Sequence, residues 1–403
     1  MIKRAGLALL LHAFLAAGAL AQTEEELRVW CKDEKARAEM RKELADYQIE
    51  EFDWEIKLSC PRLDLPRTPV HDSTGTMLDK SHTDWIYDAV YSADGRTILS
   101  AGKDYSLGLW DAESGKMIRR IAMPPGPAPS AQSSVAYVRS AVFVGDGSKL
   151  AATKDGTPVL LFDTATGKQL AELPFKVAPD DFPPNMAATK GGLLLLAGVQ
   201  DEVMAFDTGA MMVRTLLAGH LGEATAVAVS EAADLVATAA KVVDKRDAPP
   251  WERDVHVHLW RLGTGEKVGT ISLKSSDMQG LTFSRDGAQL AVLVGGSAHV
   301  YATKDRSLVR TLLVHPRFSL YDAAFTADGR GLITCQSHAM LWDIASGEIV
   351  RHFGPFQDLC HSVDVSPDGA YVVTTSMTSD LKVFEIATGT FYRRLGVDVN
   401  PPR

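Results

Sequence analysis

The stretch from Ser81 to Asp111 is the first of a series of related stretches along this chain. Two apolar-rich runs, Ile86–Tyr91 and Thr97–Ser100, flank an Asp-Gly turn. This is a strong hairpin signal, because such a turn needs residues that tolerate positive φ. Two further runs, Ser106–Trp110 and Lys116–Ile121, complete four short antiparallel strands. A sheet this small cannot bury its faces alone, so it needs copies of itself on both sides.

Seven copies can be recognised from two markers, the residue before the first turn and an aromatic-type position near the end of the third strand. The markers are separated by 18, 18, 18, 30, 17, 16 and 18 residues. The marker pairs are Ser92/Trp110, Val144/Phe162, Ala188/Phe206, Ser230/Trp260, Ser284/Tyr301, Thr326/Trp342 and Ser366/Phe384. The base period of about 41–42 residues is typical of propeller blades. The sequence therefore predicts an all-β fold, a seven-bladed β-propeller of four-stranded antiparallel blades.

The first copy closely resembles a WD repeat. Four of its residues stand where that family places a buried, hydrogen-bonded set: His82, Ser100, Asp104 and Trp110. The fourth copy repeats the set as His220, Thr238, Asp254 and Trp260. The third and fifth copies depart from the family's Leu-Trp-Asp ending. The resemblance covers roughly residues 80–396 and implies an interaction scaffold. The Asp-Gly turns are also similar to those of the Tol-system translocation propeller.

The N-terminal residues 1–21 read as a secretory signal. Lys3-Arg4 precede the apolar run Ala5–Leu20, and small residues follow at the positions that a signal peptidase reads, with cleavage expected before Gln22. The alternative is an uncleaved membrane anchor, although a run of 16 residues is short for a span. We expect secretion across a membrane, into a bacterial periplasm by the style of the signal, and membrane contact only through an uncleaved signal segment.

Residues 22–80 are predicted to form an extension ahead of the propeller, which occupies 81–397. Thr23–Ala45 is rich in Glu, Lys, Arg, Ala and Leu and begins with acidic residues, as helices do. This helix either packs against the propeller or binds a partner or second copy. Alternate residues of Phe52–Leu58 are apolar, which suggests a strand, with a continued helix as the alternative. A linker follows at 61–80.

The charge of the chain bears on its partners. The formal net charge is −9 and no basic patch is evident. Proteins that bind nucleic acids need such a patch to neutralise phosphates. We therefore expect a protein or peptide partner and no nucleic acid.

The four cysteines raise the question of disulfides in an exported protein. For Cys31 and Cys60, in the N-terminal extension, a disulfide and two free thiols are equally open. Cys335 lies in the second strand of copy six and Cys360 opens the first strand of copy seven, so neighbouring blades can bring them together. The equivalent positions elsewhere hold apolar residues: Ala101, and Ile86 or Leu320. This favours two small buried hydrophobic side chains over a disulfide.

No catalytic constellation is found in the sequence. Haem-attachment, phosphate-loop and nucleophile-elbow motifs are absent, and no cofactor is expected. His256 and His258 would share one face of a strand, which suits a metal, but no third ligand is visible. We therefore expect a non-enzymatic protein without a metal site.

Two copies carry extra length. One excess falls in Met123–Ser134, which contains four prolines, and the other in Lys241–Arg253. In the WD-repeat propellers that the chain resembles, both loop types emerge on the same face, called the top. The insertions indicate either a face used for binding or neutral drift, which surface loops tolerate. Trp251, in the second insertion, is either a recognition anchor or a cover for the adjacent blade.

The starts of the innermost strands supply further candidate residues. The position of Tyr87 is occupied in the other copies by Arg139, Pro183, Thr225, Gln279, Tyr321 and His361, and Trp85 and Tyr137 lie close by. The resemblance implies that these positions lie near the top rim of the central channel. Binding hot spots favour Trp, Tyr, Arg and His. The candidate partner-binding residues are therefore Trp85, Tyr87, Tyr137, Arg139, Trp251, Tyr321 and His361, with ordinary solvent-facing side chains as the alternative.

Three functional hypotheses follow. The leading one is a non-enzymatic, periplasmic or secreted scaffold that binds a protein or peptide on its top face. The second is a propeller enzyme of the lactonase or quinoprotein type with a site at the top of the channel. The third is a structural subunit of an envelope complex that docks through its N-terminal helix.

Overall fold

A computed structural model describes residues 82–124, 137–154, 158–173, 185–199, 202–220, 224–241, 254–274, 278–314, 319–354, 359–376 and 380–396. The chain divides into two units, Met1–Pro69 and Val70–Arg403, and all described residues belong to the second. The predicted signal segment, helix and strand of the N-terminal extension lie outside the described residues, as do Cys31 and Cys60.

The described residues form 28 strands arranged in seven four-stranded sheets. The first strands of the sheets are β1 (Ile86–Tyr91), β5 (Val138–Val144), β9 (Asn185–Ala188), β13 (Ala224–Ser230), β17 (Met278–Phe283), β21 (Asp322–Phe325) and β25 (Cys360–Val365). The second strands are β2 (Thr97–Gly102), β6 (Lys149–Lys154), β10 (Leu193–Val199), β14 (Leu235–Lys241), β18 (Gln289–Val294), β22 (Gly331–Cys335) and β26 (Tyr371–Ser376). The third strands are β3 (Ser106–Asp111), β7 (Leu160–Asp163), β11 (Glu202–Asp207), β15 (Asp254–Arg261), β19 (Ser297–Ala302), β23 (Ala339–Asp343) and β27 (Leu381–Glu385). The fourth strands are β4 (Met117–Ala122), β8 (Gln169–Glu172), β12 (Met212–Leu217), β16 (Lys267–Lys274), β20 (Leu308–Leu313), β24 (Glu348–Phe353) and β28 (Phe391–Arg394).

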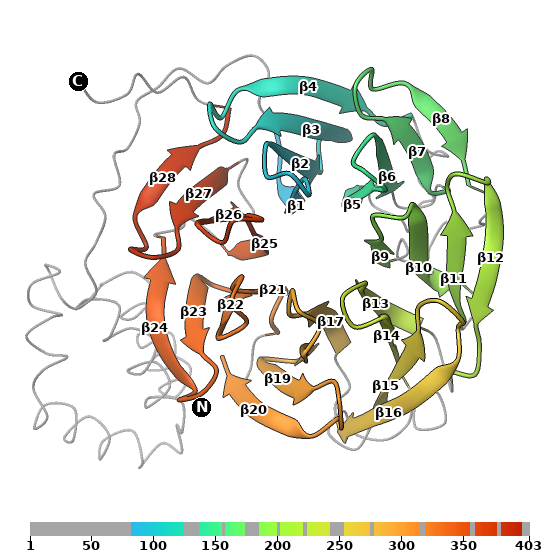
Figure 1. Ribbon diagram of the computed structural model, residues 1–403. Coiled ribbons are helices and arrows are strands. Elements are labelled where there is room, and N and C mark those ends of the chain that lie inside the picture. Colours follow the sequence, from blue (N-terminus) through green and yellow to red (C-terminus); the bar gives the residue numbers. More distant parts are fainter. Residues whose placement is uncertain are drawn as a thin grey trace, which may run out of the picture. The chain divides into compact units, whose positions relative to one another are not determined.

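The seven sheets are the blades of a β-propeller. Figure 1 shows the first strand of each sheet next to the central opening and the fourth strand at the outside. The predicted seven blades of four antiparallel strands are thus confirmed. No helix occurs in the described part of the chain, and none there has the length and apolarity of a membrane span.

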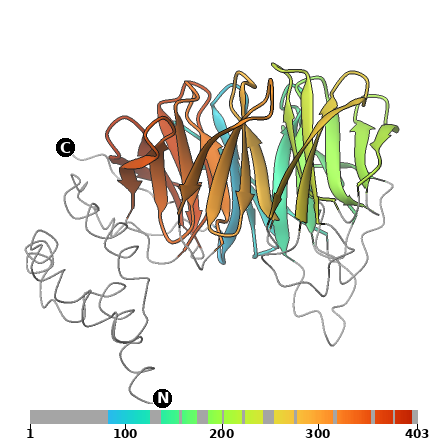
Figure 2. The same ribbon diagram turned by 90° about the horizontal axis from the view of Figure 1, so that it is seen from below.

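The strands of each blade run between two faces of the ring, as the edge-on view in Figure 2 shows. Because neighbouring strands are antiparallel, the chain enters every innermost strand from one face, and it also turns from the second to the third strand there. We call this the top face. The turns between the first and second strands lie on the opposite, bottom face.

The bottom-face turns explain why the hairpins form where the sequence places them. Between β1 and β2, Ser92 Oγ donates a hydrogen bond to Asp94 Oδ1 at 2.6 Å, and Thr97 N donates to Ser92 Oγ at 2.9 Å. Gly95 completes the turn with φ of 73°, a region that glycine enters without steric cost. The same side-chain pattern recurs three times, at Ser284/Asp286, Thr326/Asp328 and Ser366/Asp368.

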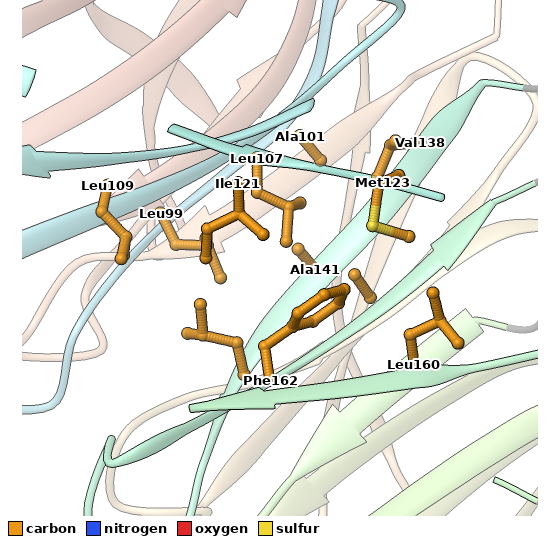
Figure 3. Close-up of a cluster of buried hydrophobic side chains, with 12 residues drawn as sticks. Leu99, Ala101, Leu107, Leu109, Ile121, Met123, Val138, Ala141, Leu160 and Phe162 are labelled. Carbon is orange, nitrogen blue, oxygen red and sulfur yellow. The ribbon is translucent and has the colours of Figure 1, made fainter. Parts of the chain in front are cut away.

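The hydrophobic core lies between neighbouring blades. In Figure 3, Leu99, Leu107 and Leu109 of the first blade face Leu160 and Phe162 of the second. All of these side chains are buried, and burial of a Leu or Phe side chain contributes about 1.5–3 kcal/mol. Each blade therefore depends on its neighbours for stability, as the repeat pattern requires.

The ring closes between the last and first blades without an exchanged strand in the described residues, since both sheets contain four consecutive strands. Ile86 and Trp110 of the first blade pack with Val373 and Val383 of the seventh in one buried cluster. Gly396 N also donates a hydrogen bond to a carbonyl oxygen of the first blade at 3.1 Å. Side-chain packing therefore closes this seam.

The interpretation of Cys335 and Cys360 as two separate buried side chains is wrong. The two residues form a disulfide, with Cα atoms 5.3 Å apart. Cys335 ends β22 and Cys360 begins β25, so the stacking of blades six and seven brings them together. Both are fully buried. The apolar residues at equivalent positions reflected this burial but carried no information about the distance between two neighbouring blades.

Candidate functional site

The predicted hydrogen-bonded set of the first blade is present and is internal to that blade. Trp110 Nε1 donates to Ser100 Oγ at 2.8 Å, and Ser100 Oγ lies 2.7 Å from His82 Nε2. His82 Nδ1 lies 2.9 Å from Asp104 Oδ1. A single tautomer satisfies every contact: Nδ1–H donates to the carboxylate and Nε2 accepts from the serine hydroxyl. The set is therefore structural.

Asp104 is held as a carboxylate by this set. Burial alone would raise its pKa, but hydrogen bonds from His82, Thr83 and Ser106 outweigh burial and lower the pKa to about 2. Arg120 Nη2 also lies 2.8 Å from Asp104 Oδ2. The carboxylate thus connects the top of β3 to the outermost strand.

The fourth blade keeps part of this arrangement and adds a residue that the sequence did not single out as structural. Trp260 Nε1 donates to Thr238 Oγ1 at 2.8 Å, and His220 Nε2 lies 2.8 Å from the same oxygen. His258 pairs with Thr238 in the sheet, and its ring centroid lies 5.1 Å from that of His220. Asp254 begins β15 and contacts Lys274 Nζ at 2.5 Å.

His258 is buried and belongs to this structural cluster. Burial and the neighbouring charge of Lys267 lower its pKa to about 4, so it is neutral at pH 7. Its Nδ1 lies 3.0 Å from Thr270 Oγ1, and His256 Nδ1 lies 2.8 Å from Ser272 Oγ. Among the residues that the structure describes, no group of three or more His, Cys, Asp or Glu is placed to hold a metal.

Five of the predicted partner-binding residues form one connected aromatic cluster at the top ends of four successive inner strands. We call it the aromatic rim, and it consists of Trp85, Tyr87, Tyr137, Tyr321 and His361. The rings of Tyr321 and His361 stack at 5.0 Å with an interplanar angle of 18°. The ring centroid of Tyr87 lies 5.0 Å from that of His361, 5.6 Å from that of Tyr137 and 6.4 Å from that of Trp85. All five side chains are half-buried, so each keeps exposed surface.

A lysine lies over one end of the aromatic rim. Lys103, in the top turn between β2 and β3, places Nζ 4.3 Å from the ring centroid of Trp85 and 5.2 Å from that of Tyr137. These distances fall within the range of cation–π attraction. Asp84 Oδ1 lies 4.0 Å from the same ammonium group. The rim thus combines aromatic surface with a positive charge.

The rim is also held to the backbone across the ring seam. His361 Nδ1 lies 2.9 Å from the carbonyl oxygen of Tyr87. A carbonyl only accepts, so the histidine Nδ1–H is the donor. This bond and the ring contacts restrict the rotamers of the rim side chains.

Below the rim, carboxylates line the inner strands of the sixth, seventh and first blades. Asp88 Oδ2 accepts a hydrogen bond from Ala141 N at 3.1 Å, and Asp322 Oδ2 accepts from Val363 N at 3.0 Å. On β25, Asp364 Oδ2 accepts a hydrogen bond from Tyr91 N of the first blade at 2.7 Å. Each of these carboxylates therefore links an inner strand to the next blade.

Ser362 lies between two of these carboxylates. Its Oγ is 3.3 Å from Asp88 Oδ1 and 3.0 Å from Asp322 Oδ2. A hydroxyl has one proton to donate, so the second contact is favourable only when a carboxyl carries a proton. Burial, opposed by hydrogen bonds, raises the pKa of Asp88, and it raises the pKa of Asp322 and of Asp364 to about 7.

The carboxylate layer was not predicted from the sequence, because its contacts join residues far apart in the chain. Asp88 and Ser362 are 274 positions apart. A weak signal did exist, since Asp follows Tyr both at Tyr87-Asp88 and at Tyr321-Asp322.

The other predicted binding residues are less fully described. Arg139 belongs to β5, and Thr225 and Gln279 belong to β13 and β17. Trp251, Pro183 and nearly all of the two insertions lie outside the described residues. The aromatic rim is therefore the part of the predicted top face on which a site can be built.

Two shallow grooves lie away from the rim, between the third and fourth blades and between the sixth and seventh. They are lined by bottom-face turns and outer strands, including Glu231, Gly263 and Arg214 in one, and Asp328, Asp368 and Arg351 in the other. The carboxylates of Asp328 and Asp368 are used within their own turns.

Residues 74–111 match the family model of the WD domain, G-beta repeat. The matched span includes all four members of the hydrogen-bonded set of the first blade. A search of curated proteins finds no match. The match to one WD repeat agrees with the structure, in which all seven blades have the same four-stranded topology.

Proposed function

Because this chain is a WD-repeat β-propeller, we propose that it is a non-enzymatic scaffold that binds a protein or peptide partner on the aromatic rim. WD-repeat propellers generally mediate protein–protein interactions, so the family supports the class of function. The observation that carries the specific site is the aromatic rim itself, in which five rings from four blades form one connected, half-exposed surface.

The composition of the rim supports a protein interface. Tyrosine and tryptophan give large contact areas at a low entropic cost and dominate binding hot spots. The ring contacts and the bond from His361 to Tyr87 preorganise the surface. Lys103 supplies a charge that restricts which partners fit.

We further propose that the protein acts after export, in an oxidising compartment such as a bacterial periplasm. Two features support this proposal: the signal-like residues 1–21 and the buried disulfide of Cys335 and Cys360. Sequencing the N-terminus of the protein from its native host tests it. The expected first residue is Gln22, and an intact Met1 would contradict export with cleavage.

The binding proposal is tested by co-purification from the native host, followed by titration of the recovered partner. Tyr87→Ala combined with Tyr321→Ala should weaken binding by roughly thirtyfold or more, since a central interface aromatic contributes about 2 kcal/mol or more. Tyr392→Ala is the matched control, because Tyr392 is an exposed tyrosine on β28, outside the rim.

The melting temperature of each variant separates lost contacts from lost folding. Asp146→Ala, in a bottom-face turn, should leave affinity unchanged. Deletion of residues 22–60 tests the N-terminal extension as the alternative docking element. If the rim variants bind the partner normally and the deletion variant does not, the N-terminal extension carries the binding site and the propeller only supports it.

A further inference from the structure

The disulfide lies directly behind one half of the aromatic rim. The backbone N–H of Tyr321 donates a hydrogen bond to the carbonyl oxygen of Cys335 at 2.9 Å. Cys360 is the chain neighbour of His361. The rings of Tyr321 and His361 stack on each other. The hydrogen bond, the S–S bond, the peptide link and the ring contact therefore form a closed cycle that includes both rings.

Neighbouring blades elsewhere pack at this position without a covalent link. Ala101 of β2 occupies the position of Cys335, and Val138 of β5 occupies that of Cys360. Both are fully buried in the core between the first two blades. Ordinary apolar packing is thus sufficient to join two blades here. Blade stacking alone therefore does not account for the disulfide, which adds a covalent link beside Tyr321 and His361.

We propose that the disulfide between Cys335 and Cys360 positions the Tyr321–His361 half of the rim, so that the binding surface depends on the redox state. The role of this surface in binding rests on the proposed function. The positioning of Tyr321 and His361 by the disulfide does not depend on it. Because His361 also donates to the carbonyl of Tyr87, a displacement of β25 is passed to the first blade.

The chemistry of reduction explains why the rim should move. A dithiol reductant supplies two electrons and two protons, the S–S bond breaks, both cysteines become thiols, and the reductant closes to its own disulfide. Once the S–S bond is broken, no covalent link joins the end of β22 to the start of β25. Packing and hydrogen bonds alone then hold these two chain segments, so they can move relative to each other.

Hydrogen–deuterium exchange measured by mass spectrometry tests the positioning without a partner. We compare the oxidised protein with dithiol-reduced protein and with Cys335→Ala/Cys360→Ala, which needs no reductant to reach the buried bond. Backbone amides in peptides covering 319–325 and 360–365 should exchange at least tenfold faster in both altered forms. The peptide covering 224–230, from the inner strand of the fourth blade, should be unchanged.

Leu160→Ala is the control for a general loss of stability, because Leu160 is buried in the core between the first and second blades. It should lower the melting temperature without accelerating exchange in 319–325. Unchanged exchange at the rim peptides, or equal acceleration in all inner strands, would overturn the positioning role. Failure of the proposed function is seen separately, as normal partner affinity of the oxidised Tyr87→Ala/Tyr321→Ala protein.

Discussion

At the scale of single residues, the first blade is organised around a hydrogen-bonded set that leaves no spare volume. Gly108 pairs with Ser100 in the sheet. A Cβ atom at Gly108 would lie 2.6 Å from Trp110 Nε1 and 2.7 Å from Ser100 Oγ. These atoms are fixed by their own hydrogen bonds, so neither can move without losing a partner.

Gly108→Ala should therefore destabilise the protein by about 1–3 kcal/mol, the usual cost of overpacking a well-packed core. Gly280→Ala is the matched control. It also lies within a strand, but its added Cβ would approach Leu293 Cδ1 only to 3.5 Å, an ordinary contact. Urea unfolding of the two variants and the parent measures the difference. Equal stability of the two variants would show that the set adjusts freely.

At the scale of strands, the inner-strand carboxylates give the propeller a dependence on pH. Burial raises the folded-state pKa of Asp322 to about 7, from an ordinary value of 3.8, with hydrogen bonds from Val363 and Ser362 acting in the opposite direction and the charge of Asp88 adding to the rise. Asp364 shifts in the same direction. A raised pKa means that the folded state binds the proton more tightly than the unfolded chain. The resulting stability is full below pH about 4 and is lost as pH rises to about 7.

Asp322→Asn should reduce the fall in melting temperature between pH 5 and pH 8. The third blade shows that asparagine fits this role, because Asn185 Oδ1 accepts a hydrogen bond from Val227 N at 3.2 Å. Asp146→Asn, on an exposed bottom-face turn, is the control and should keep the parent's pH dependence. An unchanged pH dependence in Asp322→Asn would exclude this carboxyl as its source.

The sequence predicted those elements whose determinants are local and repeated. Turn residues such as Asp94-Gly95 define each hairpin within a few positions, and alignment of the copies placed Tyr87, Tyr321 and His361 at equivalent strand starts. The disulfide and the Asp88–Ser362 contact depend on how separate blades stack. The residue spacing within one copy does not predict the distance between side chains on two different blades. The structural role of His258 was missed because the equivalent position in the first copy, which matches the family best, is Gly108.

At the scale of the whole ring, the seam between the seventh and first blades differs from the other six joints. Elsewhere the chain passes directly from one blade into the next, which limits how far they can separate. The seam is joined by the packing of Ile86, Trp110, Val373 and Val383 and by a few hydrogen bonds in the described residues.

We therefore expect the seam to open first under mild denaturation. In low urea, amides in Tyr371–Ser376 should exchange before those in the equivalent second strands of the third and fourth blades, Leu193–Val199 and Leu235–Lys241. Hydrogen exchange at increasing urea concentration measures the order of opening. Simultaneous exchange of all three strands would mean that the ring opens as one cooperative unit.

The unbroken run of four strands in every sheet has a consequence for how such a chain changes over generations. Since no described sheet takes a strand from another part of the sequence, one repeat of the gene encodes one complete blade. Duplication or loss of a repeat would add or remove a whole sheet and leave the strand pairing within the other sheets intact. A change in the number of blades would then require only that the two blade surfaces newly brought together pack against each other.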